Sequence, residues 1–266
     1  MKRLISLAIC LSLTAAVAAA QEKEKVKSKA PGPKKAGVAK LSDPLEILKK
    51  ADAAAKTVKS VKYHVVIEPS GAAEQFGGKA EGDVIMSGVL TDGGRPTIEK
   101  YYVELKVQAP NSGEIRHISG GTDGEDFYVV HHAEKTAYQD IDPAVMGRAG
   151  RTLTAGFMIE YLLDGPFDDE MNGRAREFKG IKKVAGEECY VVHVVYQNEQ
   201  APQATWHFSV KDLLPRCRVD EYTLQDGSKG AIRKTISKLE VNPKLAPDAF
   251  KLKLPEGYTQ TDDFAP

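Results

Sequence analysis

The stretch ATWHFSVKDLLPRCRVDEYTLQDG (residues 204–227) contains two runs rich in aromatic and β-branched residues, separated by a short turn. A similar run, ECYVVHVVYQ, precedes it at 188–197, and GAIRKTISKLEV follows it at 230–241. Short runs of this composition, bounded by Gly, Pro, Asn and Asp, are typical of consecutive antiparallel strands. The last third of the chain is therefore predicted to be an antiparallel meander.

The same pattern extends toward the N-terminus. Further β-rich runs lie at 62–69, 81–92, 97–110, 113–121, 125–133, 136–141 and 174–185. The turns TDGGRP and NSG between them supply residues that tolerate a positive φ. About eleven strands with few helices predict an α+β fold, in which helices cover the concave face of a single strongly curved antiparallel sheet.

One predicted helix precedes the strands, in DPLEILKKADAAAKTVKSV (residues 43–61). Asp43 is a good N-cap, Pro44 suits the first helical position, and Glu46 completes a capping box. An apolar stripe at helical spacing is formed by Leu45, Leu48, Ala51, Ala55 and Val58. We expect this amphipathic helix to lie on the sheet.

A second helical region, PAVMGRAGRTLTAGFMIEYLLDGP (residues 143–166), interrupts the strands. Gly147, Gly150 and Gly156 weaken it, so two short helices are expected. Its apolar residues are Phe157, Met158, Ile159, Tyr161, Leu162 and Leu163. They are interpreted either as ordinary core or as a mobile lid, hinged at the three glycines, that covers an apolar cavity.

The first 42 residues differ from the rest. Residues 1–20 combine a basic start with the apolar run LISLAICLSLTAAVAAA, which predicts a secretory signal peptide cleaved between Ala20 and Gln21. An uncleaved membrane anchor is the alternative. Residues 21–42 hold seven lysines and two prolines and are predicted to be a flexible linker. It is either a solubilising spacer or makes weak contact with anionic membrane.

The composition excludes some partners and restricts the redox chemistry. Lys plus Arg and Asp plus Glu both total 37 in 266 residues, so no nucleic-acid partner is expected. After cleavage, Cys189 and Cys217 remain, on the outer two of three consecutive predicted strands. That separation of about 9 to 10 Å exceeds disulfide reach, so both are predicted to be reduced and buried.

Residues with catalytic or metal-binding potential are scattered. Adjacent strand residues point to opposite faces, so His131 and His132 are predicted to bind no metal, with one ring half-buried and the other solvated. A cluster of histidines across strands is the alternative. The acidic run at 164–170 lacks the alternating ligands of a calcium loop and is predicted to be a solvated loop. Nucleophile-elbow and phosphate-loop motifs are missing from the sequence. We therefore expect no enzyme activity, cofactor or metal; a hydrolase or metal enzyme with dispersed residues is the alternative.

The order of these elements resembles the LolA/LolB-like superfamily of periplasmic lipoprotein-carrier proteins. The resemblance covers residues 43–258, and its sharpest part is the C-terminal region. There a strand is followed by Asp212, by Leu-Leu-Pro, by two further strands, and by P-x-x-F-x-L-x-x-P-x-G between Pro247 and Gly257.

The resemblance implies an unclosed half-barrel at 43–266 whose helices enclose a hydrophobic cavity for acyl chains. The residues assigned to this cavity and its lid are Phe127, Val129, Phe157, Met158, Tyr161 and Leu162. The predicted function is a periplasmic, non-enzymatic carrier or binding protein for a lipid or lipoprotein. The alternative is an envelope interaction or sensor module that binds a protein partner through the same fold.

Overall fold

The computed structural model describes residues 40–75, 77–92, 95–110, 113–140, 152–198 and 201–262. The predicted signal peptide and nearly all of the linker lie outside these residues, as do Gly147 and Gly150. The described residues from 40 to 262 belong to one compact unit.

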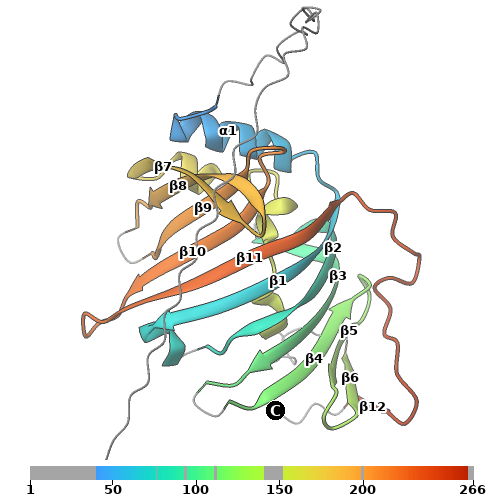
Figure 1. The fold of residues 1–266 in the computed structure, drawn as a ribbon. Helices are drawn as coiled ribbons and strands as arrows, with labels where there is room; N and C mark the ends of the chain where they lie inside the picture. The colour runs from blue at the N-terminus through green and yellow to red at the C-terminus, as the bar shows by residue number, and fades with distance from the viewer. Residues whose placement is uncertain are drawn as a thin grey trace, which may run out of the picture. The chain divides into compact units, whose positions relative to one another are not determined.

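Twelve strands of the described chain form a single sheet, in the order β12-β6-β5-β4-β3-β2-β1-β11-β10-β9-β8-β7 (Figure 1). The strands are β1 (Ser60–Gly71), β2 (Ala80–Asp92), β3 (Arg95–Gln108), β4 (Ile115–Thr122), β5 (Phe127–His131), β6 (Thr136–Asp140), β7 (Ala175–Val184), β8 (Glu187–Val195), β9 (Gln203–Ser209), β10 (Pro215–Thr223), β11 (Lys229–Val241) and β12 (Thr259–Thr261). The predicted α+β fold, with one open and mostly antiparallel sheet, is confirmed.

The sheet consists of two meanders joined in its middle. Strands β1 to β6 follow one another in space as in sequence, and so do β7 to β11. The two meanders meet where β1 pairs with β11, with Val61 opposite Val241. Strand β12 was not predicted because three residues are too short for an alternating pattern; it pairs with β6 in parallel.

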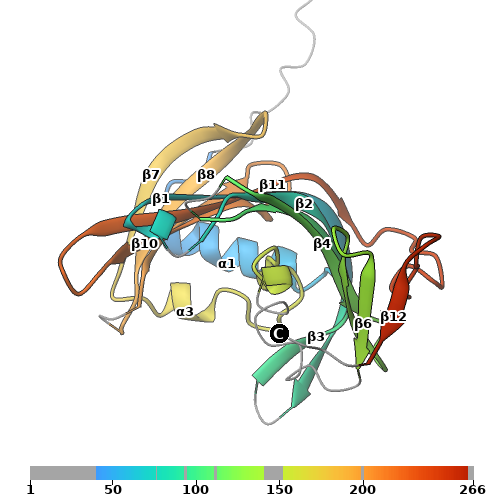
Figure 2. The same ribbon diagram turned by 90° about the horizontal axis from the view of Figure 1, so that it is seen from below.

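The predicted first helix is confirmed as α1 (Pro44–Ala55). The Asp43 carboxylate accepts a hydrogen bond from the backbone N–H of Leu45 at 3.1 Å, as an N-cap does. The buried stripe lies slightly off the predicted one, because Ile47 is fully buried whereas Leu45 is only partly buried. Figure 2 shows α1 beneath the concave side of the sheet.

Residues 152–171, which we call the cover segment, also lie on the concave side. They include the short helices η2 (Ile159–Tyr161) and α3 (Asp168–Met171), and α3 is visible beneath the sheet in Figure 2. The prediction of a solvated loop at 164–170 is only partly right. Asp164, Asp168 and Asp169 are exposed, but Phe167 is fully buried, Glu170 is 5% exposed, and the end of the run is helical.

The main core fills the space between the concave face and the two covers. A smaller cluster lies on the opposite face, where Tyr128 and Val130 of β5 pack against Leu252 and Tyr258 of the C-terminal region. The remaining short helix, η1 (Ala72–Gln75), follows β1. In the described part of the chain, no helix combines the length and apolar character needed to cross a membrane.

The two cysteines are free and buried, as predicted. Cys189 lies on β8 and Cys217 on β10, with β9 between them. Burial raises the pKa of the Cys189 thiol to about 12, which makes it a poor nucleophile.

His207 on β9 lies between Val191 and Cys217 in the sheet and is 5% exposed. Burial, followed by the nearby charges of Arg233 and Lys182, lowers the pKa of His207 to about 4. Its Nδ1 atom has no hydrogen-bond partner among the described residues.

This buried imidazole predicts acid sensitivity. Below pH 6.5 the unfolded histidine binds a proton, whereas the folded one remains neutral until about pH 4. Stability that is fully present above pH 6.5 should therefore fall by about 3 kcal/mol as the pH falls to 4. Urea unfolding of the wild type and of His207→Leu, measured from pH 7.5 to 4.5, checks this: the acid loss should be smaller in the variant. Equal losses would contradict it.

Candidate functional site

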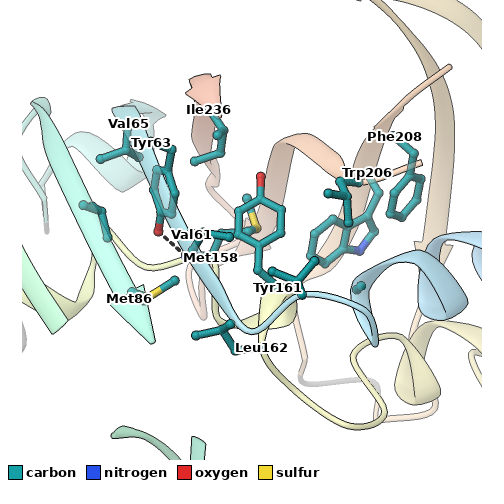
Figure 3. Close-up of a cluster of buried hydrophobic side chains, with 14 of the residues drawn as sticks. Val61, Tyr63, Val65, Met86, Met158, Tyr161, Leu162, Trp206, Phe208 and Ile236 are labelled. Atoms are coloured by element: carbon teal, nitrogen blue, oxygen red, sulfur yellow. Dashed lines mark hydrogen bonds between the residues drawn. The ribbon is translucent and has the colours of Figure 1, made fainter. Parts of the chain in front are cut away.

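The site predicted from the sequence coincides with the interior beneath the cover segment. Met158 and Tyr161 of the cover segment are at most 1% exposed, and Leu162 is 8% exposed (Figure 3). From the sheet, Val129 belongs to the same core, and Phe127 packs against it. Phe157 also packs against this core, with its ring 4.9 Å from the Tyr101 ring. The structure thus brings all six predicted residues to one core, while their role in ligand binding stays a prediction.

Tyr63 on β1 connects the sheet to the cover segment. Its hydroxyl donates a hydrogen bond to the carbonyl of Gly156 at 3.0 Å and accepts one from the backbone N–H of Met158 at 2.9 Å. The side chain is 1% exposed, and burial raises the pKa of Tyr63 well above its ordinary value, so the hydroxyl stays protonated. Figure 3 shows the bond to Met158.

Gly156 is the only predicted hinge residue that the structure describes. A Cβ atom at this position would lie 3.4 Å from Val84 Cγ2 and 3.6 Å from Val65 Cγ1, so the backbone passes directly over the sheet. Its function as a hinge stays a prediction.

A charged cluster faces the cover segment from β10 and β11. The Arg218 guanidinium contacts the Glu160 carboxylate of the cover segment at 2.7 Å and Asp220 on its own strand at 2.7 Å. Burial alone would lower the pKa of Arg218, but these two carboxylates raise it, so the cation persists. The ammonium group of Lys234 donates to the carbonyl oxygen of Phe157.

Aromatic rings adjoin this cluster. Trp206 is fully buried, and the Arg218 guanidinium carbon lies 4.8 Å from the centre of its ring system. Phe167 of the cover segment meets Trp206 edge to face, with centroids 5.3 Å apart. Nearby, the Tyr196 hydroxyl donates to the Glu170 carboxylate at 2.6 Å, while burial raises the pKa of Glu170.

Sequence reasoning missed Tyr63, Glu160, Arg218 and Lys234. Strand alternation offered one signal, since Trp206, Arg218 and Lys234 are direct cross-strand partners and so share a face. To use this signal, one must know which residues of β9, β10 and β11 lie opposite one another. The pattern of apolar residues does not determine that register.

The adjacent histidines point to different faces of the sheet: His131 is paired with Ile118 of the main core, whereas His132 lies on the opposite face. The prediction that one ring is half-buried and the other solvated was wrong for the solvated ring, because both are partly buried. His132 stacks on His117 at 3.8 Å and is hydrogen-bonded to Ser119 Oγ at 2.9 Å and to the Tyr258 hydroxyl at 3.0 Å. His117 and His132 thus form a stacked pair, and the bonds of His132 to Ser119 and Tyr258 connect the C-terminal region to β4.

Among the described residues, no group of three or more His, Cys, Asp or Glu side chains is arranged to hold a metal ion. An open groove of about 360 Å³ lies among β1, β9, β10 and β11, at their ends. It is lined mostly by polar residues and glycines, including Gln203, Glu221 and Lys229, and contains none of the predicted site residues.

No family model and no curated protein sequence matches this chain. Solved structures do match. MucB is 14% identical with a TM-score of 0.47, and the match covers 79% of this chain and 63% of MucB. LprF from Mycobacterium bovis is 14% identical with a TM-score of 0.48, covering 79% of this chain and 99% of LprF; a LolA superfamily protein from Nitrosomonas europaea is 12% identical with a TM-score of 0.33, covering 80% of this chain and 99% of that protein. The chain thus spans less than two thirds of MucB. All three likenesses lie below 15% identity and below a TM-score of 0.5.

Tyr63→Phe tests whether the hydroxyl fixes the cover segment. The variant keeps the ring but leaves a buried carbonyl and a buried N–H without their partner, which costs about 2 to 4 kcal/mol. Hydrogen exchange of peptides from 152–171 should therefore accelerate. Tyr128→Phe is the matched control, because its hydroxyl binds the carbonyl of Phe250 instead. Unchanged exchange in Tyr63→Phe would show that the hydroxyl does not hold the segment.

Proposed function

We propose that this protein is a non-enzymatic carrier or binding protein of the cell envelope, and that it holds an acyl-bearing ligand between the concave face and the cover segment. Export by residues 1–20, a linker at 21–42 and a binding domain at 43–266 belong to the same proposal. The ligand would be a lipid or an acylated protein.

The proposal rests on how the cover segment contacts the sheet: several of its apolar side chains are fully buried, although the segment has little regular secondary structure. The described cover segment has only short helical turns, yet it places Leu153, Met158, Tyr161 and Phe167 at 0 to 1% exposure against the sheet. A segment with little regular structure contributes few backbone hydrogen bonds of its own, so it can leave the sheet without unfolding a long helix. Its departure would uncover a continuous apolar wall.

An acyl chain suits such a wall. Burying a methylene group contributes about 0.8 kcal/mol, so a long chain can replace the apolar contacts that the cover segment gives up. The polar contacts to be broken include Tyr63 with Gly156 and Met158, and Arg218 with Glu160. Opening therefore has a definite cost, which the ligand would offset.

A reversible crosslink tests the proposal. A Cβ at position 156 would lie 3.4 Å from Val84 Cγ2, so a cysteine sulfur in place of that methyl group would be within bonding reach of a cysteine at 156. In Gly156→Cys/Val84→Cys, oxidation should hold the cover segment closed. Uptake of dodecyl phosphate and of dodecyl maltoside, measured by calorimetry, should be lost on oxidation and return on reduction.

The single variants Gly156→Cys and Val84→Cys are the controls, because neither can form this crosslink and Cys189 and Cys217 are buried. Uptake that persists in the oxidised double variant would place binding elsewhere. If the wild type binds neither amphiphile, the carrier proposal fails, and co-purification with an envelope protein becomes the next measurement for the alternative interaction or sensor function.

A further inference from the structure

One row of side chains crosses the concave face beside the cover segment. Trp206 on β9 is paired with Arg218 on β10, and Arg218 is paired with Lys234 on β11. Lys234 is paired in turn with Ile67 on β1, which belongs to the apolar core. Two cations thus occupy adjacent positions at the border of an apolar wall.

The charges in this row are balanced by the cover segment. Glu160 supplies a carboxylate to Arg218, and the Phe157 carbonyl accepts from Lys234. The sheet itself supplies only Asp220. In the closed state, burial lowers the pKa of Lys234 while the Glu160 and Asp220 carboxylates raise it, and opening removes the burial that disfavours the cation. When the cover segment leaves, two positive charges face one negative charge, so the row keeps a net charge of +1.

We infer that Trp206, Arg218 and Lys234 form a headgroup subsite, and that the ligand is an anionic amphiphile whose phosphate or carboxylate takes the place of the Glu160 carboxylate. The inference rests on the proposed function and specifies its ligand class. In the closed state, the Glu160 carboxylate occupies the position that the ligand's anion would take. A planar guanidinium beside an ammonium group suits either anion, since arginine binds carboxylate and phosphate oxygens in pairs.

The position of the row fits the polarity of an amphiphile. The Arg218 and Asp220 side chains are 25% and 19% exposed, whereas Tyr63 and Met158 are 1% exposed. A headgroup at the row would thus reach water while its chain lay in the apolar interior. An uncharged ligand would leave both cations facing a single carboxylate, and a cationic ligand would be repelled.

The test compares amphiphiles with the same chain. Dodecyl phosphate, dodecyl maltoside and dodecyltrimethylammonium are titrated below their micelle concentrations, with inorganic phosphate alone as a fourth probe. Trp206 is the single tryptophan of the chain and lies in the row, so its fluorescence reports binding there. Calorimetry gives an independent affinity. The anion should bind at least about tenfold more tightly than the uncharged amphiphile.

Three variants locate the preference. Glu160→Gln removes the carboxylate that the ligand's anion displaces and should tighten binding of dodecyl phosphate about tenfold. Because the same change weakens closure, dodecyl maltoside should also bind more tightly, and the preference for the anion should persist. Arg218→Gln/Glu160→Gln removes both partners of that ion pair and leaves Asp220 with Lys234 as the nearby cation. The preference for the anion should then fall about tenfold. Lys62→Gln, an exposed lysine paired with Glu240 on the same sheet, should behave as the wild type.

Equal affinity for dodecyl phosphate and dodecyl maltoside would overturn the inference while leaving the proposed function intact. So would a preference that survives in Arg218→Gln/Glu160→Gln. If inorganic phosphate alone binds as tightly as dodecyl phosphate, the row is a site for a free anion and not for a headgroup. If no amphiphile binds, both the proposed function and the inference are wrong.

Discussion

An open sheet with an apolar concave face must be covered by chain that is not part of the sheet, and the rest of this structure depends on that constraint. The sheet does not close on itself, so strands alone cannot shield Val65, Val103 or Leu105 from water. Helix α1 covers part of the face with a regular apolar stripe. The cover segment shields the rest with short turns, and the proposed opening therefore assigns the movement to this segment and not to α1.

The irregular cover also explains why polar side chains occur in an apolar wall. A segment with little helix has backbone groups that find no partner within the segment, and buried groups of this kind need one. The sheet provides it: the Tyr63 hydroxyl binds at Gly156 and Met158, and Lys234 binds at Phe157. The same side chains that stabilise the closed arrangement would be left without partners when it opens.

Strand positions were predictable from the sequence because β-rich runs and turn residues alternate so regularly. The faces were not. On β10, Cys217 and Val219 alternate with Arg218 and Asp220, which favours the charged residues as the solvated face. In the structure, both faces of this strand are largely covered, and Arg218 lies against Trp206 and Glu160. The partner of Arg218 in the cover segment, Glu160, is 58 residues away in sequence, so no local pattern identifies it.

The prediction of six interior residues rested on the density of apolar side chains and on the resemblance, and these residues do converge on one core. The polar contacts that hold the cover segment needed the three-dimensional register. Likewise, the acidic run at 164–170 was assigned from its own residues alone, whereas the burial of Phe167 and Glu170 depends on contacts with the core.

The pairing of β1 with β11 has a consequence for how the chain folds. Each meander forms from neighbouring strands, so its contacts are local and quickly made. The two meanders join where Val61 of β1 lies opposite Val241 of β11. Until β11 has been synthesised, the edge of β1 that pairs with it has no hydrogen-bonding partner. An unpaired edge of this kind recruits other strands. The nascent first meander is therefore the species most exposed to aggregation, and a chaperone that shields β1 would protect the chain until its second half arrives.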